Sequence, residues 1–289
     1  MNSINYNSNL TVIIVSFHSD QIIENLINSI QDDIKILVVE NSLNFKLKKH
    51  LESNFKNVEV IIPSKNMGNG GGINVGLKLV KTKFSLYLDV DTLPEPNMIN
   101  VLLEYTKKIK DFSVLAPRDK NFLYDDELYL EKSRDKNYHK MKFITGCALL
   151  FNMESVEKIG LFDENIFLYY EEHDFYYRCL KLGLNIYLLD DAKIIHHGSS
   201  SVDKNYNYEI QINRNWHYCW SKFYYFKKNF GYFYGIKKTI PNLFRAIRKY
   251  ILYKIKRDFK KSSLHSAEIN GLITSYLLKK SSRRPKLDT

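Results

Sequence analysis

The chain has 289 residues, of which 44% are hydrophobic and 26% charged, and it carries a formal net charge of +11. No apolar run approaches the roughly 18 residues that a membrane-spanning helix needs, and the polar N-terminus lacks the pattern of a secretory signal, so we expect a cytoplasmic protein without a membrane span. The three cysteines are widely spaced, without the Cys-x-x-Cys pairs of zinc and redox sites, so we expect reduced, buried thiols.

Short β-branched runs alternate with helical stretches over the first 120 residues. The first run, Leu10–Val15, is apolar without alternation, as expected of a strand that is buried on both faces. Strands are predicted at residues 10–15, 34–39, 58–62, 84–88 and 112–116, and helices at residues 21–30, 45–55, 72–80 and 97–110. This order predicts an α/β fold with a mainly parallel sheet flanked by helices, in which residues 1–120 form the nucleotide-binding half.

Residues 121–212 form a second, shorter half of the same domain. The pattern predicts extended chain at residues 141–153, a short helix at 154–159 and a short strand that ends near His197. A further helix at residues 172–182 is expected to end at Gly183, because glycine suits the left-handed position after a helix. Residues 1–212 are therefore expected to make up one catalytic-type domain.

Residues 213–289 are predicted to form a basic, aromatic, mostly helical region. Helices are expected at residues 213–230, 235–261 and 267–278, with Pro241 beginning or kinking the second. From Asn215 onward there are 18 Lys and Arg residues against three acidic ones, a balance of +15, whereas the first 214 residues carry −4. Such a charge suits nucleic acid or an anionic membrane surface.

The basic region lacks the sequence motifs of common nucleic-acid-binding modules. It has no zinc-finger spacing and no RNA-binding aromatic signature, so we expect no nucleic acid partner. The mixture of apolar and basic residues at 236–261 leaves two interpretations open. The segment could lie in a membrane interface, or it could be an amphipathic helix packed on the catalytic body with a solvated basic face.

Polar residues and glycines follow the first three predicted strands, and ligands of open parallel sheets bind beyond these strand ends. Ser16 follows the first strand, Glu40 the second, and a glycine-rich segment at Asn66–Asn74 the third. Glycines let a backbone pass close to a bulky ligand, and the helix N-terminus that follows favours phosphate. A dinucleotide-binding G-x-G-x-x-G pattern is excluded, because Ile73 or Val75 replaces its third glycine. A loop that only requires positive φ explains the glycines equally well.

Two carboxylates, Asp89 and Asp91, follow the fourth strand. In extended chain they point to the same side, about 7 Å apart. A divalent cation with diphosphate oxygens is their natural occupant, and hard oxygen ligands favour magnesium or manganese. A turn cap is the plainer interpretation of an isolated pair. Of the adjacent His196 and His197, whose rings point to opposite faces, at most one can share a metal with Asp91, and we choose His196.

A run of carboxylates, Glu171, Glu172 and Asp174, begins the helix predicted at residues 172–182. Helix capping is the plainer interpretation, because the helix dipole favours negative charge at this end. Asp174 and Arg178 are also spaced for a structural ion pair. Because Glu171 and Glu172 follow four apolar residues, however, a buried carboxylate here could remove a proton from a sugar hydroxyl.

The ordered set of these motifs resembles glycosyltransferase family 2, particularly its bacterial rhamnosyltransferase-like and galactofuranosyltransferase-like members. The resemblance covers roughly the first 200 residues. It rests on Val12–Ser16, Val38–Asn41, Asn66–Gly76, Asp89–Asp91, Gly160–Glu164, Glu171–Asp174 and His196–Gly198. The family usually has Asp at position 40 and Glu-Asp at positions 171–172, so Glu40 and Glu172 keep the carboxylate on an arm one methylene longer.

The resemblance implies a GT-A fold and an inverting, metal-dependent hexosyltransferase. Its donor would be a UDP- or dTDP-linked sugar such as rhamnose or galactofuranose, and its acceptor a hydroxyl of a bacterial surface polysaccharide or lipid-linked glycan. Such an enzyme would work in the cytoplasm, peripherally on the inner face of the cytoplasmic membrane.

The resemblance also implies roles for single residues. Nucleobase and ribose would lie near Ser16, Glu40 and Asn66, Asp89 would touch the region of ribose and metal, Asp91 and His196 would bind Mn²⁺ or Mg²⁺, and Glu172 would be the catalytic base. We add Gly68 and Asn74 to the donor site. Glu171 and Asp174 are expected to support the acceptor side, with Glu172 facing Asp91 and His196 over the space for a sugar.

Two other functions stay open at this stage. A sugar-nucleotide nucleotidyltransferase also pairs a glycine-rich loop with metal-binding aspartates, but its loop follows the first strand, where this chain has Ser16-Phe17-His18. A non-catalytic nucleotide- or glycan-binding module would bind without turnover and would not need the full set of carboxylates.

Overall fold

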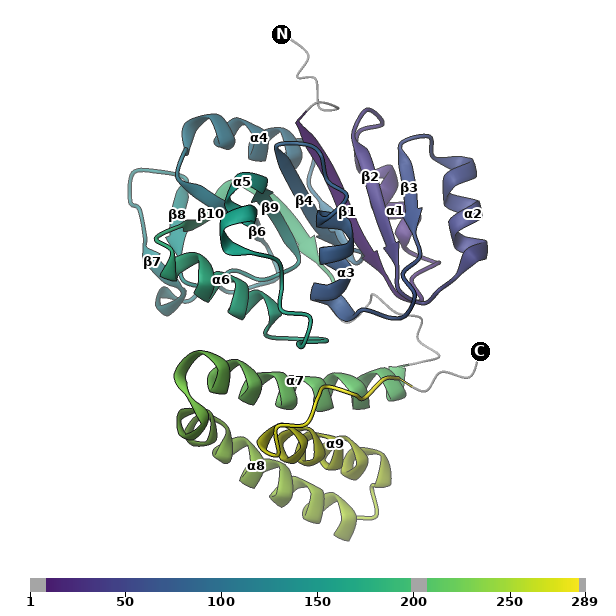
Figure 1. Cartoon of the computed structure of the whole chain (residues 1–289), viewed down its shortest axis with the longest axis vertical. Helices are drawn as coiled ribbons and strands as arrows, with labels where there is room; N and C mark the ends of the chain where they lie inside the picture. Colours follow the sequence, from purple (N-terminus) through teal and green to yellow (C-terminus); the bar gives the residue numbers. More distant parts are fainter. Residues whose placement is uncertain (1–8, 199–206, 286–289) are drawn as a thin grey trace. The chain divides into compact units, whose positions relative to one another are not determined.

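The computed structural model describes residues 9–198 and 207–285, which form two compact units (Figure 1). The first unit lies within residues 1–67, 72–162 and 175–203, and the second within residues 68–71, 163–174 and 204–289. Residues 68–71 and 163–174 thus group with the C-terminal region in the second unit. The units interleave along the sequence, so the linear division expected at residue 212 stays a prediction.

One mixed sheet runs through the first unit, with ten strands in the described residues. The strands are β1 (Leu10–Ser16), β2 (Lys35–Glu40), β3 (Val58–Ile61), β4 (Phe84–Asp89), β5 (Thr92–Pro94), β6 (Phe112–Asp119), β7 (Tyr129–Glu131), β8 (Tyr138–Met141), β9 (Ala148–Asn152) and β10 (Asn185–His196). Their order is β3-β2-β1-β4-β9-β6-β10-β8-β7, with β5 paired to β10. Strands β1 to β4 pair in parallel, as predicted, and antiparallel pairs of β9, β8 and β5 make the whole sheet mixed.

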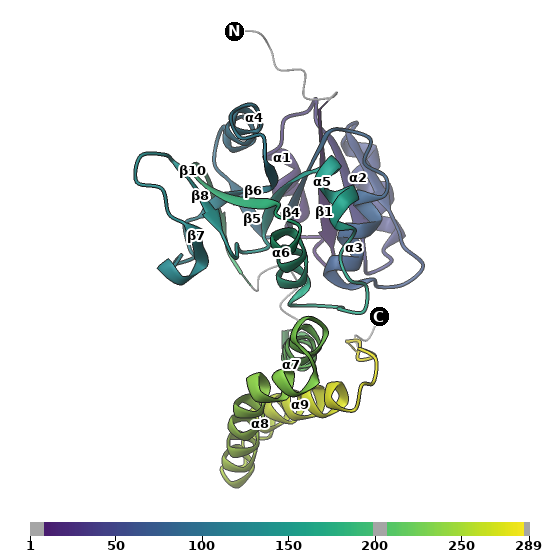
Figure 2. The same cartoon turned by 60° about the vertical axis from the view of Figure 1, so that its left-hand side comes forward.

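Helices cover both faces of this sheet (Figure 2). They are α1 (Ile23–Asn28), α2 (Phe45–Asn54), α3 (Gly68–Leu77), α4 (Met98–Lys108), α5 (Met153–Ile159) and α6 (Glu171–Lys181). The alternation of buried side chains along β1 separates two layers: Val12 and Ile14 pack in one core with α1, α2 and α4, whereas Ile13 packs in the other with α3, α5 and α6. Strands buried on both faces explain the unbroken apolar runs of the sequence.

Helix α3 begins at Gly68, four residues before its predicted start. Gly72 and Gly76 lie against β1, where an added Cβ would come within 2.8 Å of Val15 Cγ1 and 2.7 Å of Ile13 Cγ2, respectively. These two glycines therefore permit close packing of a helix on a strand, which no other residue allows without displacing the neighbour.

The second unit is built on α7 (Asn207–Phe230), α8 (Tyr232–Ile255) and α9 (Phe259–Tyr276). The helix predicted at residues 235–261 is wrong at its C-terminal end, because α8 ends at Ile255. The helix predicted at residues 267–278 is wrong at its N-terminal end, because α9 begins at Phe259. Arg257 has a φ of 55°, and Asp258 accepts a hydrogen bond from the Lys261 backbone, so the chain breaks and α9 begins there. Pro241 lies inside α8.

The helices of the second unit pack closely at α7 and α9. An added Cβ on Gly271 of α9 would come within 2.3 Å of the Trp216 carbonyl oxygen on α7.

All three cysteines are buried and free, as predicted. In residues 9–198 and 207–285, the longest apolar helical stretches fall short of what a membrane crossing requires.

Candidate active site

Three of the predicted ligand residues, Asp89, Asp91 and His196, converge in the first unit. His196 Nε2 lies 3.3 Å from Asp91 Oδ1 and 3.7 Å from Asp89 Oδ2. The local fold enforces this approach, because β5 follows Asp91 directly and pairs with β10, with His196 opposite Thr92. The segment that carries the aspartates therefore also aligns the strand that carries the histidine.

The chemistry of this cluster fits a divalent cation. Its two carboxylates and one imidazole each offer a ligand atom, and these atoms lie within 4.8 Å of one another. Burial alone would lower the pKa of His196, but its hydrogen bond with Asp91 and the charges of Asp89, Asp91 and Asp119 raise that pKa overall. The cluster thus favours a positive charge at this point, and oxygen-rich donor sets with one imidazole suit Mn²⁺ or Mg²⁺.

Asp89 and Asp91 differ in their surroundings. The side chain of Asp91 is 4% exposed and that of Asp89 is 30% exposed. Asp89 accepts a hydrogen bond from the hydroxyl of Tyr87, and its carbonyl oxygen accepts one from Thr92 Oγ1 at 2.6 Å. The more exposed carboxylate is therefore held in place and is the one open to a ligand.

Asp119, at the end of β6, is a site residue that sequence reasoning missed. Its Oδ1 accepts hydrogen bonds from the backbone nitrogens of Asn121 and His196, at 3.0 and 3.2 Å, and its Oδ2 lies 3.9 Å from His196 Nδ1. Contacts of this kind orient the imidazole, so that Nε2 faces Asp91. The sequence feature that could have identified Asp119 is its position at the carboxyl end of a strand. The predicted strand ended at residue 116, however, three residues short of Asp119.

Ser16 and Glu40 lie beside each other in register at the carboxyl ends of β1 and β2, and both are fully buried. Glu40 Oε1 accepts hydrogen bonds from the backbone nitrogen, at 2.7 Å, and the hydroxyl of Ser42. Ser16 Oγ and Glu40 Oε2 have no hydrogen-bond partner among the residues that the structure describes. Burial raises the pKa of Glu40, and the neighbouring Ser42 and Ser16 lower it only in part. Because buried polar atoms without partners cost about 1–3 kcal/mol, this position favours a polar ligand group.

The glycine-rich segment is tied to its neighbours by two asparagines. Asn41 Oδ1 accepts a hydrogen bond from the Met67 backbone nitrogen at 3.2 Å, next to the half-buried Asn66. Asn74 is fully buried, and its amide both donates to and accepts from the Phe162 backbone, at 2.9 Å each. Asn74 therefore links α3 to the segment after α5, and its contact with a donor stays a prediction.

The predicted carboxylates Glu171, Glu172 and Asp174 lie in the second unit, in the segment of residues 163–174. This segment packs against Gly68 and Asn69. Asn69 donates from its backbone nitrogen to the Phe167 carbonyl oxygen and from Nδ2 to Glu171 Oε1, at 3.0 Å each.

Gly68 is the glycine that this packing requires. It has a φ of +75°, and an added Cβ would lie 2.0 Å from the Phe167 carbonyl oxygen. Positive φ and the close approach both demand glycine here. The role of Gly68 is thus to let the helix start meet the segment that ends in Glu171.

The backbone just before Glu171 is strained. Tyr169 and Tyr170 have φ values of 63° and 67°, in the left-handed region where a non-glycine residue costs about 1–3 kcal/mol. The ring of Tyr170 packs against Tyr218 and Tyr225 of α7, with centroids 5.7 and 5.6 Å apart. Helix α7 therefore stabilises a conformation that leads directly into α6.

The candidate base Glu172 has a side chain that is 19% exposed, and its Oε1 lies 3.3 Å from His173 Nδ1. It is more accessible than Glu171, which is 4% exposed. Of these two carboxylates Glu172 is thus the more exposed, and its role as a base stays a prediction.

Lys228 of α7 anchors the same segment through two carboxylates. Its Nζ lies 2.8 Å from both Asp163 Oδ2 and Asp174 Oδ1, and the Asp174 side chain is fully buried. Tyr224 adds a hydrogen bond to Asp163 at 3.0 Å. Burial would raise the pKa of Asp163, but the hydrogen bond and charge of Lys228 and the hydrogen bonds of Asn165 lower it overall.

Replacing Lys228 with Met is expected to lower the free energy of unfolding by about 2–4 kcal/mol. The buried Asp174 would lose the cation that lies 2.8 Å from it, and removing one partner of a buried ion pair is strongly destabilising. Urea denaturation followed by fluorescence measures this change. Lys237→Met, at an exposed position of α8, is the matched control; equal midpoints for both variants would contradict the anchoring role.

Comparison with known proteins places the chain among sugar-transferring enzymes. The family model described as "Glycosyl transferase family 2" matches residues 11–160. The dTDP-rhamnosyl transferase RfbF of Shigella flexneri is 24% identical over 210 residues, which cover 66% of this chain and 69% of that protein. The low-salt glycan biosynthesis hexosyltransferase Agl10 of Haloferax volcanii is 25% identical over 208 residues, which cover 65% and 66%. The chain thus spans about two thirds of the length of each.

Solved structures share the fold at low sequence identity. The mannosyltransferase PcManGT from Pyrobaculum calidifontis, in complex with GDP-Man and Mn²⁺, superposes with a TM-score of 0.58 at 12% identity, covering 92% of this chain and 86% of that one. Residues 1–349 of TarS from S. aureus, in complex with UDP-GlcNAc, give 0.54 at 13% identity, covering 94% and 92%. These likenesses confirm the predicted GT-A-type α/β fold with a helical C-terminal region.

Proposed function

The chain belongs to glycosyltransferase family 2, and from this premise we propose that it transfers a sugar, with inversion, from a nucleotide-diphosphate donor to a hydroxyl of a glycan acceptor. The observation that carries the proposal is the convergence of Asp89, Asp91 and His196 at one edge of the sheet. We propose a UDP- or dTDP-linked hexose such as rhamnose or galactofuranose as donor, in line with the dTDP-rhamnosyl transferase among its relatives. The acceptor we propose is a surface polysaccharide or a lipid-linked glycan.

The donor would be held by the strand ends of the parallel half. The unsatisfied Ser16 Oγ and Glu40 Oε2 would receive polar groups of the nucleobase or ribose, which would remove the cost of leaving them buried without partners. Asn66 and Gly68 would lie near the donor on the glycine-rich segment, and Asp89 would contact the ribose and the adjoining phosphate region. Asn74 would act at the donor site through the backbone that it positions.

Asp91 and His196, together with Asp89, would hold Mn²⁺ or Mg²⁺. A bound divalent cation supplies charge neutralisation for a departing diphosphate. Glu172 would accept the proton of the acceptor hydroxyl while the hydroxyl oxygen attacks the anomeric carbon of the donor sugar. The nucleoside diphosphate would leave from the opposite side, and this single displacement would invert the anomeric carbon. Glu171, bonded to Asn69, and Asp174, paired with Lys228, would position Glu172.

A donor panel tests this function. Purified protein is incubated with UDP- and dTDP-linked hexoses and Mn²⁺ or Mg²⁺, and release of nucleoside diphosphate is measured with and without acceptor glycans. Release that depends on both metal and acceptor supports transfer. Formation of diphosphate from a nucleoside triphosphate and a sugar phosphate would instead identify a nucleotidyltransferase, and donor binding without any turnover would identify a binding module.

We further propose that α8 binds an anionic membrane surface, which would bring the enzyme to lipid-linked acceptors on the cytoplasmic face. Five of its exposed apolar side chains share one stripe at helical spacing, Phe233, Ile240, Phe244, Ile251 and Ile255, and Leu252 is exposed beside it. Phe233 is 86% and Ile255 is 75% exposed. Gly235, Thr239 and Ala246 on the opposite face are buried. The helix carries six Lys and Arg residues and no acidic residue, which complements anionic lipid.

The triple variant Phe244→Ser/Ile251→Ser/Ile255→Ser is expected to lose most of its flotation with vesicles that contain anionic lipid. Insertion of these side chains into the interface supplies the apolar part of the binding, and serine removes it. The effect is measured by flotation of the full chain on phosphatidylcholine vesicles in which about a third of the lipid is phosphatidylglycerol. Phe45→Ser/Leu123→Ser, at exposed apolar positions of the first unit, is the control. Failure of the unaltered chain to float would remove the proposal.

A further inference from the structure

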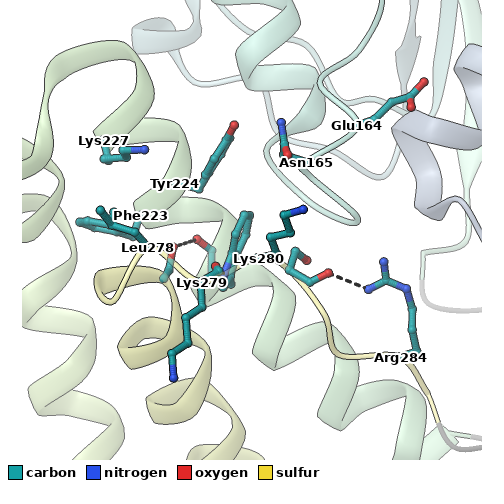
Figure 3. A pocket seen from close by; sticks show the side chains of 12 residues that line it. Glu164, Asn165, Phe223, Tyr224, Lys227, Leu278, Lys279, Lys280 and Arg284 are labelled. Atoms are coloured by element: carbon teal, nitrogen blue, oxygen red, sulfur yellow. Dashed lines mark hydrogen bonds between the residues drawn. The ribbon is translucent and has the colours of Figure 1, made fainter.

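A pocket of about 300 Å³ lies within the second unit, and none of the residues assigned above to donor and metal lines it (Figure 3). Its walls come from α7, from the stretch that follows α9 and from the loop that carries Glu164. The volume is at the lower end of that of ligand pockets, which span about 300–1,000 Å³, and it accommodates a group of the size of a diphosphate.

The pocket is strongly basic and its charges are not neutralised. Lys227, Lys280 and Arg284 line it, and Glu164 is the one acidic side chain among its described lining residues. In the described parts of the chain no carboxylate lies within ion-pair distance of these three cations. The neighbouring Lys228 differs, because Asp163 and Asp174 satisfy it.

Arg284 is held ready for an anion. Its guanidinium carbon lies 3.7 Å from the centroid of the Phe167 ring, and Nη1 donates to the carbonyl oxygens of Ser281 and Arg283, at 3.0 and 2.6 Å. Burial lowers the pKa of Arg284, which is the effect of partial desolvation without a counter-charge. A fixed, partly desolvated guanidinium pairs well with phosphate oxygens, because its planar donors match their geometry.

The aromatic wall of the pocket is rigid. Trp220 and Tyr224 stack with centroids 4.9 Å apart and planes 15° apart. Trp220 Nε1 donates to the Lys279 carbonyl oxygen at 3.0 Å, which ties the stretch carrying Lys280 and Arg284 to α7. The cations thus stand on a preformed frame, which reduces the entropy lost when a ligand orders them.

We propose that this pocket binds the phosphate or diphosphate group of a ligand through Lys227, Lys280 and Arg284. Three unneutralised cations around a small volume suit a multiply charged anion. The same chemistry is offered by free diphosphate and by the phosphomonoester headgroup of a lipid. The proposal does not depend on the transferase activity or on the metal cluster.

Calorimetric titration with sodium diphosphate in the presence of EDTA tests the free source, since EDTA removes divalent cations from the cluster at Asp91. The full chain is expected to bind with one-to-one stoichiometry. Lys280→Ser/Arg284→Ser is expected to weaken binding at least about tenfold, because it removes two cations that donate charge-assisted hydrogen bonds to the anion. Lys227→Ser on α7 checks the same pocket from its other wall.

Vesicles test the lipid source. Flotation is compared on phosphatidylcholine vesicles that contain phosphatidic acid, a phosphomonoester, or phosphatidylglycerol at equal charge. A lipid ligand predicts a preference for phosphatidic acid that the pocket variants lose, whereas the α8 variants lose binding to both. A pocket for free diphosphate predicts no preference.

The control is Lys46→Ser/Lys56→Ser, which removes two exposed positive charges of the first unit, outside both the pocket and α8, and should change binding less than about twofold. Equal weakening by the control and the pocket variants would reduce the effect to overall charge and overturn the proposal. Absence of diphosphate binding together with absence of a phosphatidic acid preference would overturn it as well. Thermal unfolding confirms that each variant is folded.

Discussion

Replacing Asp91 with Asn is expected to lower turnover about 10²–10⁴-fold and to abolish high-affinity Mn²⁺ binding. Asp91 is the buried carboxylate of the cluster and lies 3.3 Å from His196 Nε2. A metal ion contributes several kcal/mol to stabilising charge on a leaving group, and each 1.36 kcal/mol corresponds to about a tenfold change in rate. Release of nucleoside diphosphate measures turnover, and titration with MnCl₂ measures binding.

The matched control for this substitution is Asp135→Asn, an exposed aspartate in the loop before β8. It removes the same charge and should leave turnover and Mn²⁺ binding within about twofold of the original values. If Asp91→Asn retained Mn²⁺ affinity and lost turnover, the cluster would not be the metal site. If it retained both, the proposed chemistry at this edge of the sheet would be wrong.

Replacing Glu172 with Gln is expected to reduce turnover by about 10²–10⁴-fold while donor and metal binding stay unchanged. Glutamine keeps the size and the hydrogen-bonding geometry of the side chain but accepts no proton. Turnover at saturating donor, together with donor titration, separates this effect from a loss of binding.

Glu157→Gln, on the exposed side of α5, provides the control for charge removal. Glu171→Gln offers a second comparison, because Glu171 is bonded to Asn69 and is assigned a positioning role. A Glu172→Gln enzyme with near-normal turnover and bound donor would exclude Glu172 as the base. A larger loss for Glu171→Gln than for Glu172→Gln would move the assignment by one residue.

The fold could be predicted best where apolar runs are uninterrupted. Strands β1 to β4 were predicted within two residues at each end. Strands β1, β2 and β4 are buried on both faces, whereas β3 exposes Glu59. Strand β10 begins at Asn185, whereas only its last part was predicted. Asp190 and Asp191 interrupt its apolar pattern at a shift in register, and Asp190 is satisfied by Arg118 and His139, which lie far away in the sequence.

The candidate site shows the same contrast between local and distant information. Asp89 and Asp91 could be found because they follow a clear strand, and His196 because it ends another. The role of Asp119 depends on a histidine that lies 77 positions away in the chain. The sequence alone could not show which glycines are required for packing and by which neighbour. Gly72 packs against Val15 of β1 and Gly68 against the Phe167 backbone, and both neighbours are distant in the sequence.

The interleaved second unit also constrains the order in which the protein can be completed during synthesis. Its early segments leave the ribosome well before Lys228, and a ribosome adds roughly 5–20 residues per second. Until α7 emerges, the contacts of Lys228 with Asp163 and Asp174 cannot form. A chain cut short before α7 could therefore fold much of its sheet, yet it would leave Glu172 on a segment without its anchor.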